Sequence, residues 1–133
     1  IFINNAVYGM TQGQMAPTTL LGQKTTTTPR GRDAALAGHP MRMCELLNTL
    51  DGPAFIAREA LSTPPHLRRA KKAIRRAFET QVAGLGFSIV ELLSTCPTWW
   101  GMSPVEAVRH VDEAMTEQFP LNVFRDRLSE QES

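Results

Sequence analysis

Apolar residues follow two spacings along the chain, one typical of buried strands and one typical of helices. Short continuous apolar runs indicate strands inside a sheet, whereas apolar residues three or four positions apart indicate amphipathic helices. By these criteria we expect strands at residues 1–3, Ala54–Ala57 and Phe87–Leu93, and helices at Met43–Leu50, at His66–Ala83 and from Ser103 onward. Because helices and strands alternate, the pattern predicts an α/β fold with a parallel sheet flanked by helices.

The two longer predicted helices each have an apolar face. In helix 66–83 the residues expected to face the sheet are Leu67, Ala70, Ile74, Ala77, Phe78 and either Gln81 or Val82. The last helix opens with Ser103 as N-cap, Pro104 in the first turn and Glu106 completing a capping box. Its expected apolar face consists of Val105, Val108, Val111 and Met115.

Residues 4–40 show little periodicity and are rich in Gly and Thr, notably in the run Lys24–Arg32. A loop of this length inside a compact domain is usually functional or flexible. Two interpretations stay open. The segment is either a Thr-rich linker or a loop that covers a ligand, the second because it directly follows the Asn4-Asn5 pair.

Composition narrows the class of protein. A chain of 133 residues with 42% hydrophobic and 20% charged residues is typical of one soluble globular domain. A net charge of +1 gives no general attraction to nucleic acid or to a membrane, and no apolar run approaches the roughly 20 residues that cross a bilayer. There is no secretory signal, and two cysteines make no disulfide framework, so we expect a cytoplasmic protein.

The segment after the first apolar run carries the candidate chemistry. Asn4 and Asn5 precede a Gly-containing loop, as ligand-binding residues do at the carboxyl ends of strands in open α/β folds. Amide and carbonyl oxygens suit Mg²⁺, and the Gly and Thr that follow offer N–H and hydroxyl donors for phosphate. The simpler interpretation is that the two Asn side chains only satisfy the backbone of a turn.

Three other sets of residues have both a structural and a functional interpretation. Cys44 is expected in the core, and Cys96, between a buried strand and Pro97, is more often inert than reactive at such a position. The basic run in the helix reads as a solvated face, or as a surface for an acidic ferredoxin or coenzyme A phosphates; it comprises Arg68, Arg69, Lys71, Lys72, Arg75 and Arg76. No aromatic residue interleaves with it, which argues against nucleic acid. The three His lack metal spacing, and Trp99 and Trp100 are expected to pack.

Several motifs together resemble one enzyme family. They are Asn4-Asn5-Ala6-Val7-Tyr8-Gly9-Met10-Thr11, Gly13-Gln14-Met15-Ala16-Pro17-Thr18-Thr19, Lys24–Pro29, Leu50–Ala54, Leu93–Thr98, Trp100–Pro104 and Phe119-Pro120-Leu121. Nearly the whole chain thus resembles the thiamine-diphosphate-binding β subunit of 2-oxoacid:ferredoxin oxidoreductases, in the 2-oxoglutarate and 2-ketoisovalerate branch. The resemblance implies that residues 1–133 form the C-terminal part of a thiamine-diphosphate-binding domain, with the cofactor turn and a long loop in residues 1–40 and the remaining α/β units in residues 41–133.

The resemblance also assigns roles to single residues. It implies that the Asn5 side chain and the Val7 carbonyl bind Mg²⁺ and that Gly9, Met10 and Thr11 line thiamine diphosphate. Met10 and Gln12 would face the substrate, although the family commonly has Gly or Lys where Gln12 stands. Cys96 would be the fourth thiolate of a 4Fe-4S cluster.

The family's activity is oxidative decarboxylation of a 2-oxoacid to an acyl-coenzyme A, with ferredoxin as electron acceptor and an α subunit as partner. By resemblance we expect 2-oxoglutarate as the substrate. The family's Gly-Asp-Gly motif and its other three cysteines are not in this sequence, and the chain opens within an apolar run at Ile1. We therefore expect a fragment that lacks N-terminal strands and is inactive alone. The alternatives are another thiamine-diphosphate enzyme, of the acetolactate-synthase type, and a non-catalytic α/β interaction domain.

Overall fold

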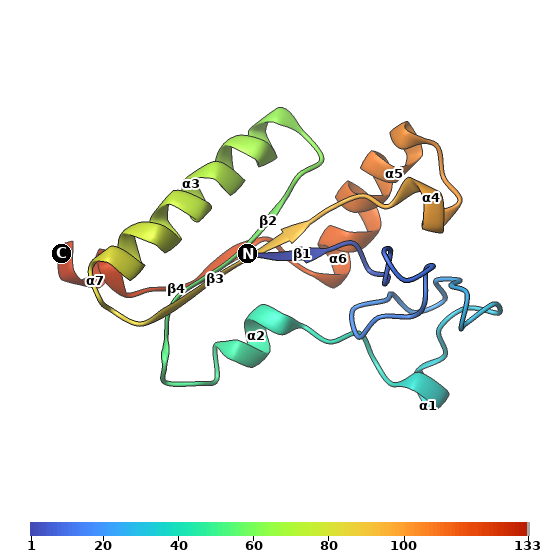
Figure 1. Cartoon of the computed structure of the whole chain (residues 1–133), viewed down its shortest axis with the longest axis horizontal. Coiled ribbons are helices and arrows are strands. Elements are labelled where there is room, and N and C mark those ends of the chain that lie inside the picture. Colours follow the sequence, from blue (N-terminus) through green and yellow to red (C-terminus); the bar gives the residue numbers. More distant parts are fainter. Residues whose placement is uncertain (133) are drawn as a thin grey trace.

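The chain forms an α/β unit with one four-stranded sheet (Figure 1). A computed structural model describes residues 1–132. The strands are β1 (Phe2–Asn4), β2 (Pro53–Ala60), β3 (Phe87–Leu93) and β4 (Asn122–Asp126). The helices are α1 (Ala34–Ala37), α2 (Met43–Leu47), α3 (Pro64–Val82), α4 (Pro97–Trp100), α5 (Pro104–His110), the π-helix η1 (Val111–Met115), α6 (Thr116–Gln118) and α7 (Arg127–Glu132).

The sheet has the strand order β1-β3-β2-β4. β3 pairs in parallel with β1 and β2, which confirms the predicted α/β class and parallel arrangement for these three strands. β4 is an antiparallel edge strand that the sequence did not predict. Its residues are exposed or half-buried, so it lacks the apolar run by which the other strands were recognised. The strand predicted at Ala54–Ala57 extends to Ala60. The prediction ended too early because Arg58 and Glu59 are charged and interrupt the apolar run, although both are buried in the strand.

Helix α3 covers one face of the sheet, with Ala70, Ala73 and Ala77 packed on Phe55, Ala57, Val90 and Leu92. The predicted apolar face of this helix is therefore only partly correct. Leu67, Phe78 and Val82 are exposed, whereas Thr80 is buried. Small residues face the sheet because they let the helix approach it closely, and the larger apolar side chains lie beside that contact line.

Helix α2 lies on the opposite face of the sheet from α3 (Figure 1), and α5, η1 and α6 lie toward the carboxyl ends of β2 and β3. The capping box of Ser103 and Glu106 forms as predicted. Of the expected apolar face, Val111 and Met115 are fully buried, but Val105 is exposed and Ala107 is buried instead. Ala107, Val111 and Met115 follow one another at four-residue steps. This spacing, together with the π-helix that begins at Val111, shifts the buried line away from Val105.

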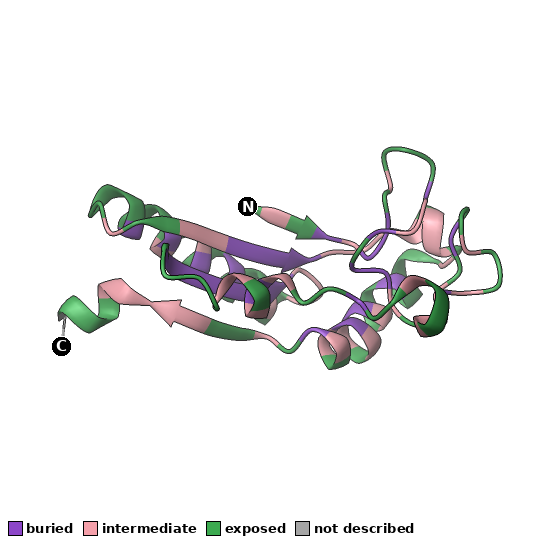
Figure 2. Ribbon diagram, turned by 90° about the horizontal axis from the view of Figure 1, so that it is seen from below, coloured by how far each residue is buried: buried purple, intermediate pink, exposed green. Residues whose placement is uncertain are grey.

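The loop of residues 4–40 folds around one buried arginine. The Arg32 side chain donates hydrogen bonds to six main-chain carbonyls, those of Ala16, Pro17, Thr19, Ala37, Gly38 and His39. Burial lowers the pKa of its guanidinium. Figure 2 shows buried positions within this loop, which favours an ordered loop over a linker.

Candidate functional site

The Asn4–Tyr8 turn begins at the carboxyl end of β1, beside the carboxyl end of β3. Asn4 is the register partner of Leu93, and the Ser94 N–H donates to the Asn4 carbonyl at 2.9 Å. The segment that carries Cys96 therefore leaves the sheet next to the segment that carries Asn5. Ligand sites of open parallel sheets lie at this edge.

The turn is reversed at Ala6 and held from both sides there. Ala6 has a φ of 56°, a left-handed conformation uncommon for a residue with a Cβ. Its N–H donates to Asn4 Oδ1 at 3.0 Å, and its carbonyl accepts from Thr19 Oγ1 at 2.7 Å and from Gln23 Nε2 at 3.0 Å. Thr19 and Gln23 thus hold the Asn4–Tyr8 turn from the later part of the loop. We call Asn4–Tyr8 the cofactor turn, after the role that the family resemblance implies for it.

Asn5 and Val7 lie on either side of Ala6. The Asn5 side chain is half-buried, and its Oδ1 accepts only a long hydrogen bond of 3.3 Å from the Val7 N–H. The Val7 carbonyl accepts from the Gly9 N–H at 3.1 Å. Each oxygen retains a lone pair, and amide and carbonyl oxygens are hard donors of the type that Mg²⁺ prefers. These two residues fit a partial Mg²⁺ site.

Cys96 and Asn5 meet across Gly9. A Cβ placed on Gly9 would lie 3.4 Å from Asn5 Nδ2 and 3.5 Å from Cys96 Sγ. The structure therefore places the side chains of the two predicted metal ligands close to the same glycine, with the amide nitrogen of Asn5 toward it. Cys96 is half-buried and precedes α4, and its carbonyl accepts from the Trp100 N–H at 3.0 Å.

The residues Met10, Thr11 and Gln12 form an exposed bend beyond this point. Their main-chain N–H groups donate to no residue in the described chain, so three successive donors are free for the oxygens of an anion. The Thr11 hydroxyl already donates to Gln14 Oε1 at 2.7 Å. Gln12 has a φ of 80°, a left-handed conformation that glycine adopts more readily than residues with a Cβ. The side chains of Met10 and Gln12 are both exposed.

Beside Asn5 lies a cavity of about 230 Å³. Its lining is free of charged side chains and comprises Phe2, Ile3, Asn4, Asn5, Val7, Tyr8, Ala16, Pro17, Thr18 and Met43. The cavity is small and bounded by the cofactor turn on one side. An uncharged lining favours apolar or neutral polar groups as occupants.

The described residues form no complete site of His, Cys, Asp and Glu ligands for a metal ion. In residues 1–132 no group of three or more His, Cys, Asp and Glu side chains could hold a metal ion. Cys44 cannot assist Cys96, because it is fully buried and its Sγ–H donates to Glu91 Oε2 at 3.1 Å. Burial raises the pKa of the Cys44 thiol, and the neighbouring Glu91 carboxylate adds to this. Among residues 1–132, Cys96 is therefore the cysteine accessible to a metal or cluster, and it could supply one ligand.

Sequence reasoning did not assign specific contacts to the two tryptophans. The Trp100 Nε1–H donates to the Asn5 carbonyl at 3.0 Å, and the Trp99 ring lies against Gly13. A Cβ on Gly13 would lie 2.4 Å from Trp99 Cε3. Both side chains thereby join α4 to the cofactor turn. The only signal for this in the sequence is the position of both tryptophans four residues or fewer after Cys96.

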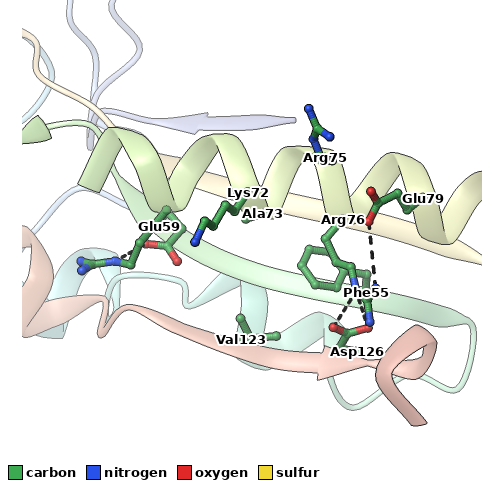
Figure 3. A pocket seen from close by; sticks show the side chains of 10 residues that line it. Phe55, Glu59, Lys72, Ala73, Arg75, Arg76, Glu79, Val123 and Asp126 are labelled. Carbon is green, nitrogen blue, oxygen red and sulfur yellow. Dashed lines mark hydrogen bonds and ion pairs between the residues drawn. The ribbon is translucent and has the colours of Figure 1, made fainter. Parts of the chain in front are cut away.

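The basic residues of α3 lie mostly apart from the cofactor turn. Figure 3 shows a groove of about 430 Å³ between α3 and β4, with Phe55, Ala73 and Val123 among its lining residues. At its wall, Arg76 Nε lies 2.9 Å from Asp126 Oδ2. Arg69 pairs with Glu59 at 3.3 Å. The other four basic side chains, those of Arg68, Lys71, Lys72 and Arg75, are exposed, as expected for a solvated helix face.

One histidine has a carboxylate partner that helical spacing did not reveal. His66 Nδ1 lies 2.7 Å from Ser62 Oγ and 3.4 Å from Asp112 Oδ1, and the Ser62 hydroxyl donates to Asp112. Because the serine proton is directed at the carboxylate, the imidazole is not placed to remove it. The cluster joins the start of α3 to η1.

Of the helices in residues 1–132, none has the length and apolar character needed to cross a membrane.

Comparison with known proteins places these residues in a wider context. Residues 1–92 match the family described as thiamine pyrophosphate enzyme, C-terminal TPP binding domain. The chain is 52% identical over 131 residues to ketoisovalerate oxidoreductase subunit VorA of Methanothermobacter thermautotrophicus, covering 98% of this chain and 28% of that protein. It is 36% identical over 113 residues to 2-oxoglutarate synthase subunit KorB of Archaeoglobus fulgidus, covering 85% of this chain and 38% of that protein.

A third relative is 2-oxoacid:ferredoxin oxidoreductase subunit beta of Saccharolobus solfataricus, 32% identical over 72% of this chain and 28% of that protein. The chain therefore spans between a quarter and two fifths of the length of these curated relatives. No solved structure matches it.

Proposed function

Because the chain belongs to the thiamine pyrophosphate enzyme family, as its C-terminal TPP binding domain, we propose that it is part of a 2-oxoacid:ferredoxin oxidoreductase. The observation that carries this proposal is the meeting of Asn5 and Cys96 at Gly9. The amide group of Asn5, whose oxygen suits Mg²⁺, and the Cys96 sulfur, which suits iron, both lie close to Gly9. A cofactor site next to a redox centre is what such an enzyme needs.

The chain's own residues would bind and orient the cofactor. The Asn5 side chain and the Val7 carbonyl supply oxygen to Mg²⁺, and the free N–H groups from Met10 to Gln12 face the diphosphate. Gly9 leaves room between Asn5 and Cys96. The chemistry that bound thiamine diphosphate supplies is attack on the 2-oxo carbon and stabilisation of the negative charge left by decarboxylation. The Cys96 thiolate would ligate one iron of a 4Fe-4S cluster that passes electrons to ferredoxin.

The exposed bend implies a partner chain. Met10 and Gln12 are the residues expected to face the substrate, and both are exposed. We propose that an α subunit covers this bend and completes the pockets for the 2-oxoacid and coenzyme A. Residues 1–40 then act as the cofactor turn with its supporting loop, and residues 41–133 as the α/β units behind it.

For the substrate we propose a branched-chain 2-oxoacid such as 2-ketoisovalerate, in place of the 2-oxoglutarate expected from resemblance. Identity supports this choice, at 52% to the ketoisovalerate oxidoreductase subunit and 36% to the 2-oxoglutarate synthase subunit. A kcat/KM for 2-oxoglutarate above that for 2-ketoisovalerate in the assembled enzyme would refute it.

The cofactor proposal is tested with two variants of the assembled enzyme. Asn5→Ala should raise the dissociation constant for Mg²⁺-thiamine diphosphate by roughly tenfold or more, as expected for loss of a metal ligand. Asn122→Ala is the control, since Asn122 is an exposed residue of β4. Cys96→Ala should lower the iron content and abolish ferredoxin reduction. Unchanged cofactor affinity together with normal iron content would remove both roles.

A further inference from the structure

Beneath the cofactor turn, both oxygens of the Glu91 carboxylate are engaged. Glu91 is fully buried in the middle of β3, on the face of the sheet opposite α3. Its Oε1 accepts from Asn4 Nδ2 at 2.7 Å, and its Oε2 accepts from Arg58 Nε at 2.7 Å. A carboxylate at this depth remains charged only if it is paired and hydrogen-bonded. Arg58 meets this requirement on one side and Asn4 on the other.

Arg58 is itself held rigidly. It is fully buried, and its guanidinium donates to both carboxylate oxygens of Glu45, at 3.0 and 2.6 Å, and to the Pro120 carbonyl at 3.1 Å. The rings of Phe119 and Phe124 lie 5.5 and 5.2 Å from it. These hydrogen bonds and ring contacts restrain the guanidinium, so Arg58 gives Glu91 a fixed anchor.

This anchor determines which way the Asn4 amide faces. A carboxylate only accepts hydrogen bonds, so Glu91 must receive the NH₂ group of Asn4. The amide oxygen of Asn4 is thereby directed at Ala6, and it accepts a hydrogen bond of 3.0 Å from the Ala6 N–H. Ala6 is the residue with φ of 56° that reverses the turn between Asn5 and Val7.

We propose that Glu91 is a positioning residue for the cofactor turn. Through Asn4 it holds Ala6 in its left-handed conformation, and so sets where the Asn5 side chain and the Val7 carbonyl lie. The cofactor turn contributes the ligands, and the Glu91 carboxylate, in the sheet beneath the turn, determines their geometry. The inference rests on the proposed function for its consequence on cofactor binding, but not for its consequence on Ala6.

The pattern of donors and acceptors allows a swap test in the assembled enzyme. In Glu91→Gln, the new amide can satisfy Arg58 or Asn4 but not both, since each presents an N–H donor. In Asn4→Asp, two carboxylates face each other. In the double variant Asn4→Asp/Glu91→Gln, the new glutamine accepts from Arg58 and donates to the new aspartate, whose other oxygen accepts from the Ala6 N–H. Every hydrogen bond from Arg58 to the Ala6 N–H is then restored. The negative charge has moved from position 91 to its hydrogen-bond partner at position 4.

We expect each single variant to raise the dissociation constant for Mg²⁺-thiamine diphosphate by about 10- to 100-fold, the range found when partners of metal ligands are removed. The dissociation constant of the double variant should return to within about threefold of that of the unmodified protein, because the effects of substitutions at two interacting residues are not additive. Amide hydrogen exchange of Ala6 should accelerate in both single variants and slow again in the double variant. Glu59→Gln is the control, since Glu59 is a buried acid of β2 that pairs with Arg69. It should change neither readout.

The outcomes separate this inference from the proposed function. If the unmodified protein does not bind the cofactor, the function fails, and the exchange of Ala6 alone decides the positioning role. If a single variant does not fold but the double variant does, the pairing of Asn4 with Glu91 is supported. Unchanged Ala6 exchange in both single variants would overturn the proposal. So would a double variant as defective as the two single effects combined.

Discussion

The indole of Trp100 donates a hydrogen bond of 3.0 Å to the main-chain carbonyl of Asn5, joining two residues 95 positions apart. This contact connects the segment after β3 to the segment after β1, above the edge of the sheet. It orients the peptide group that follows Asn5, and therefore the chain direction through the cofactor turn. The proposed Mg²⁺ ligand and the segment carrying Cys96 are consequently one structural unit.

Trp100→Phe should weaken this unit without removing its apolar contacts. The variant keeps a ring in place but removes a partly buried hydrogen bond to the Asn5 carbonyl, and such a bond typically contributes about 0.5–1.5 kcal/mol. We expect a lower free energy of unfolding by denaturant and weaker binding of Mg²⁺-thiamine diphosphate. A variant with the stability and cofactor affinity of the original protein would show that the hydrogen bond does not hold the turn.

Gly13 and Gly22 form a matched pair for testing the packing of Trp99. Both have positive φ, 77° and 75°, but a Cβ on Gly13 would overlap the Trp99 ring, whereas none of the described atoms lies within 4 Å at Gly22. Gly22→Ala should therefore cost only the backbone strain, about 1–2 kcal/mol, and Gly13→Ala about 2–3 kcal/mol more. Equal losses of stability in denaturant would mean that Trp99 moves aside freely.

Arg32→Lys should disrupt the loop although the charge is kept. A lysine ammonium has three donors on a flexible stem and cannot reproduce a planar guanidinium that reaches six carbonyls. We expect a loss of at least about 3 kcal/mol of stability, because several hydrogen bonds are lost and each one to a charged group contributes about 1.5–3 kcal/mol. Faster proteolysis between residues 13 and 40 should accompany it. Arg30→Lys, at an exposed position of the same loop, should change neither.

Hydrophobic spacing predicted the elements whose burial follows a simple rule. Phe87–Leu93 was predicted with its observed bounds, since an apolar run in a parallel sheet is buried on both faces. β4 was missed because an antiparallel edge strand needs no such run. In α3 the larger apolar residues suggested a face that alanines occupy, since closeness of approach to the sheet decided which side chains are buried.

The site could be predicted only where a residue acts through its own chemistry. Asn5, Gly9 and Cys96 were identified by side-chain type and motif, and the fold brings them together. Arg58 and Glu91 were not, because charged residues in strands usually mark a solvated face and their pairing depends on strand register. The single acid inside the apolar strand 87–93 was the available signal. Arg32 gave no signal, as its six acceptors are all main-chain carbonyls.

The two cysteines should differ in reactivity. Cys44 is fully buried, and burial raises the pKa of its thiol, so little of the reactive thiolate forms. Cys96 is half-buried at the cofactor turn. A thiol reagent applied to the iron-free protein should modify one cysteine under native conditions and two after unfolding, and Cys96→Ser should abolish the native reaction. Native labelling of Cys44, located by peptide mapping, would contradict the buried position of this side chain.

His110 should make stability depend on pH in the mildly acidic range. Its ring lies 4.9 Å from the Trp100 ring, centroid to centroid, and burial lowers its pKa from the usual 6.5, although the charge of Glu113 opposes this. The unfolded chain therefore takes up a proton at a higher pH than the folded chain does. Stability is then complete above about pH 6.5 and falls as the pH decreases toward the lowered folded-state pKa.

This dependence is measured as the free energy of unfolding between pH 8 and pH 5. Carboxylates also titrate at the acid end, so the informative quantity is the difference between variants. His110→Gln should lose less stability than the unmodified protein as the pH falls from 7 to 5.5, because it has no imidazole to protonate. His39→Gln, at an exposed position, should behave like the unmodified protein. If His110→Gln and His39→Gln show the same pH profile, protonation of His110 is not resisted by its place against Trp100.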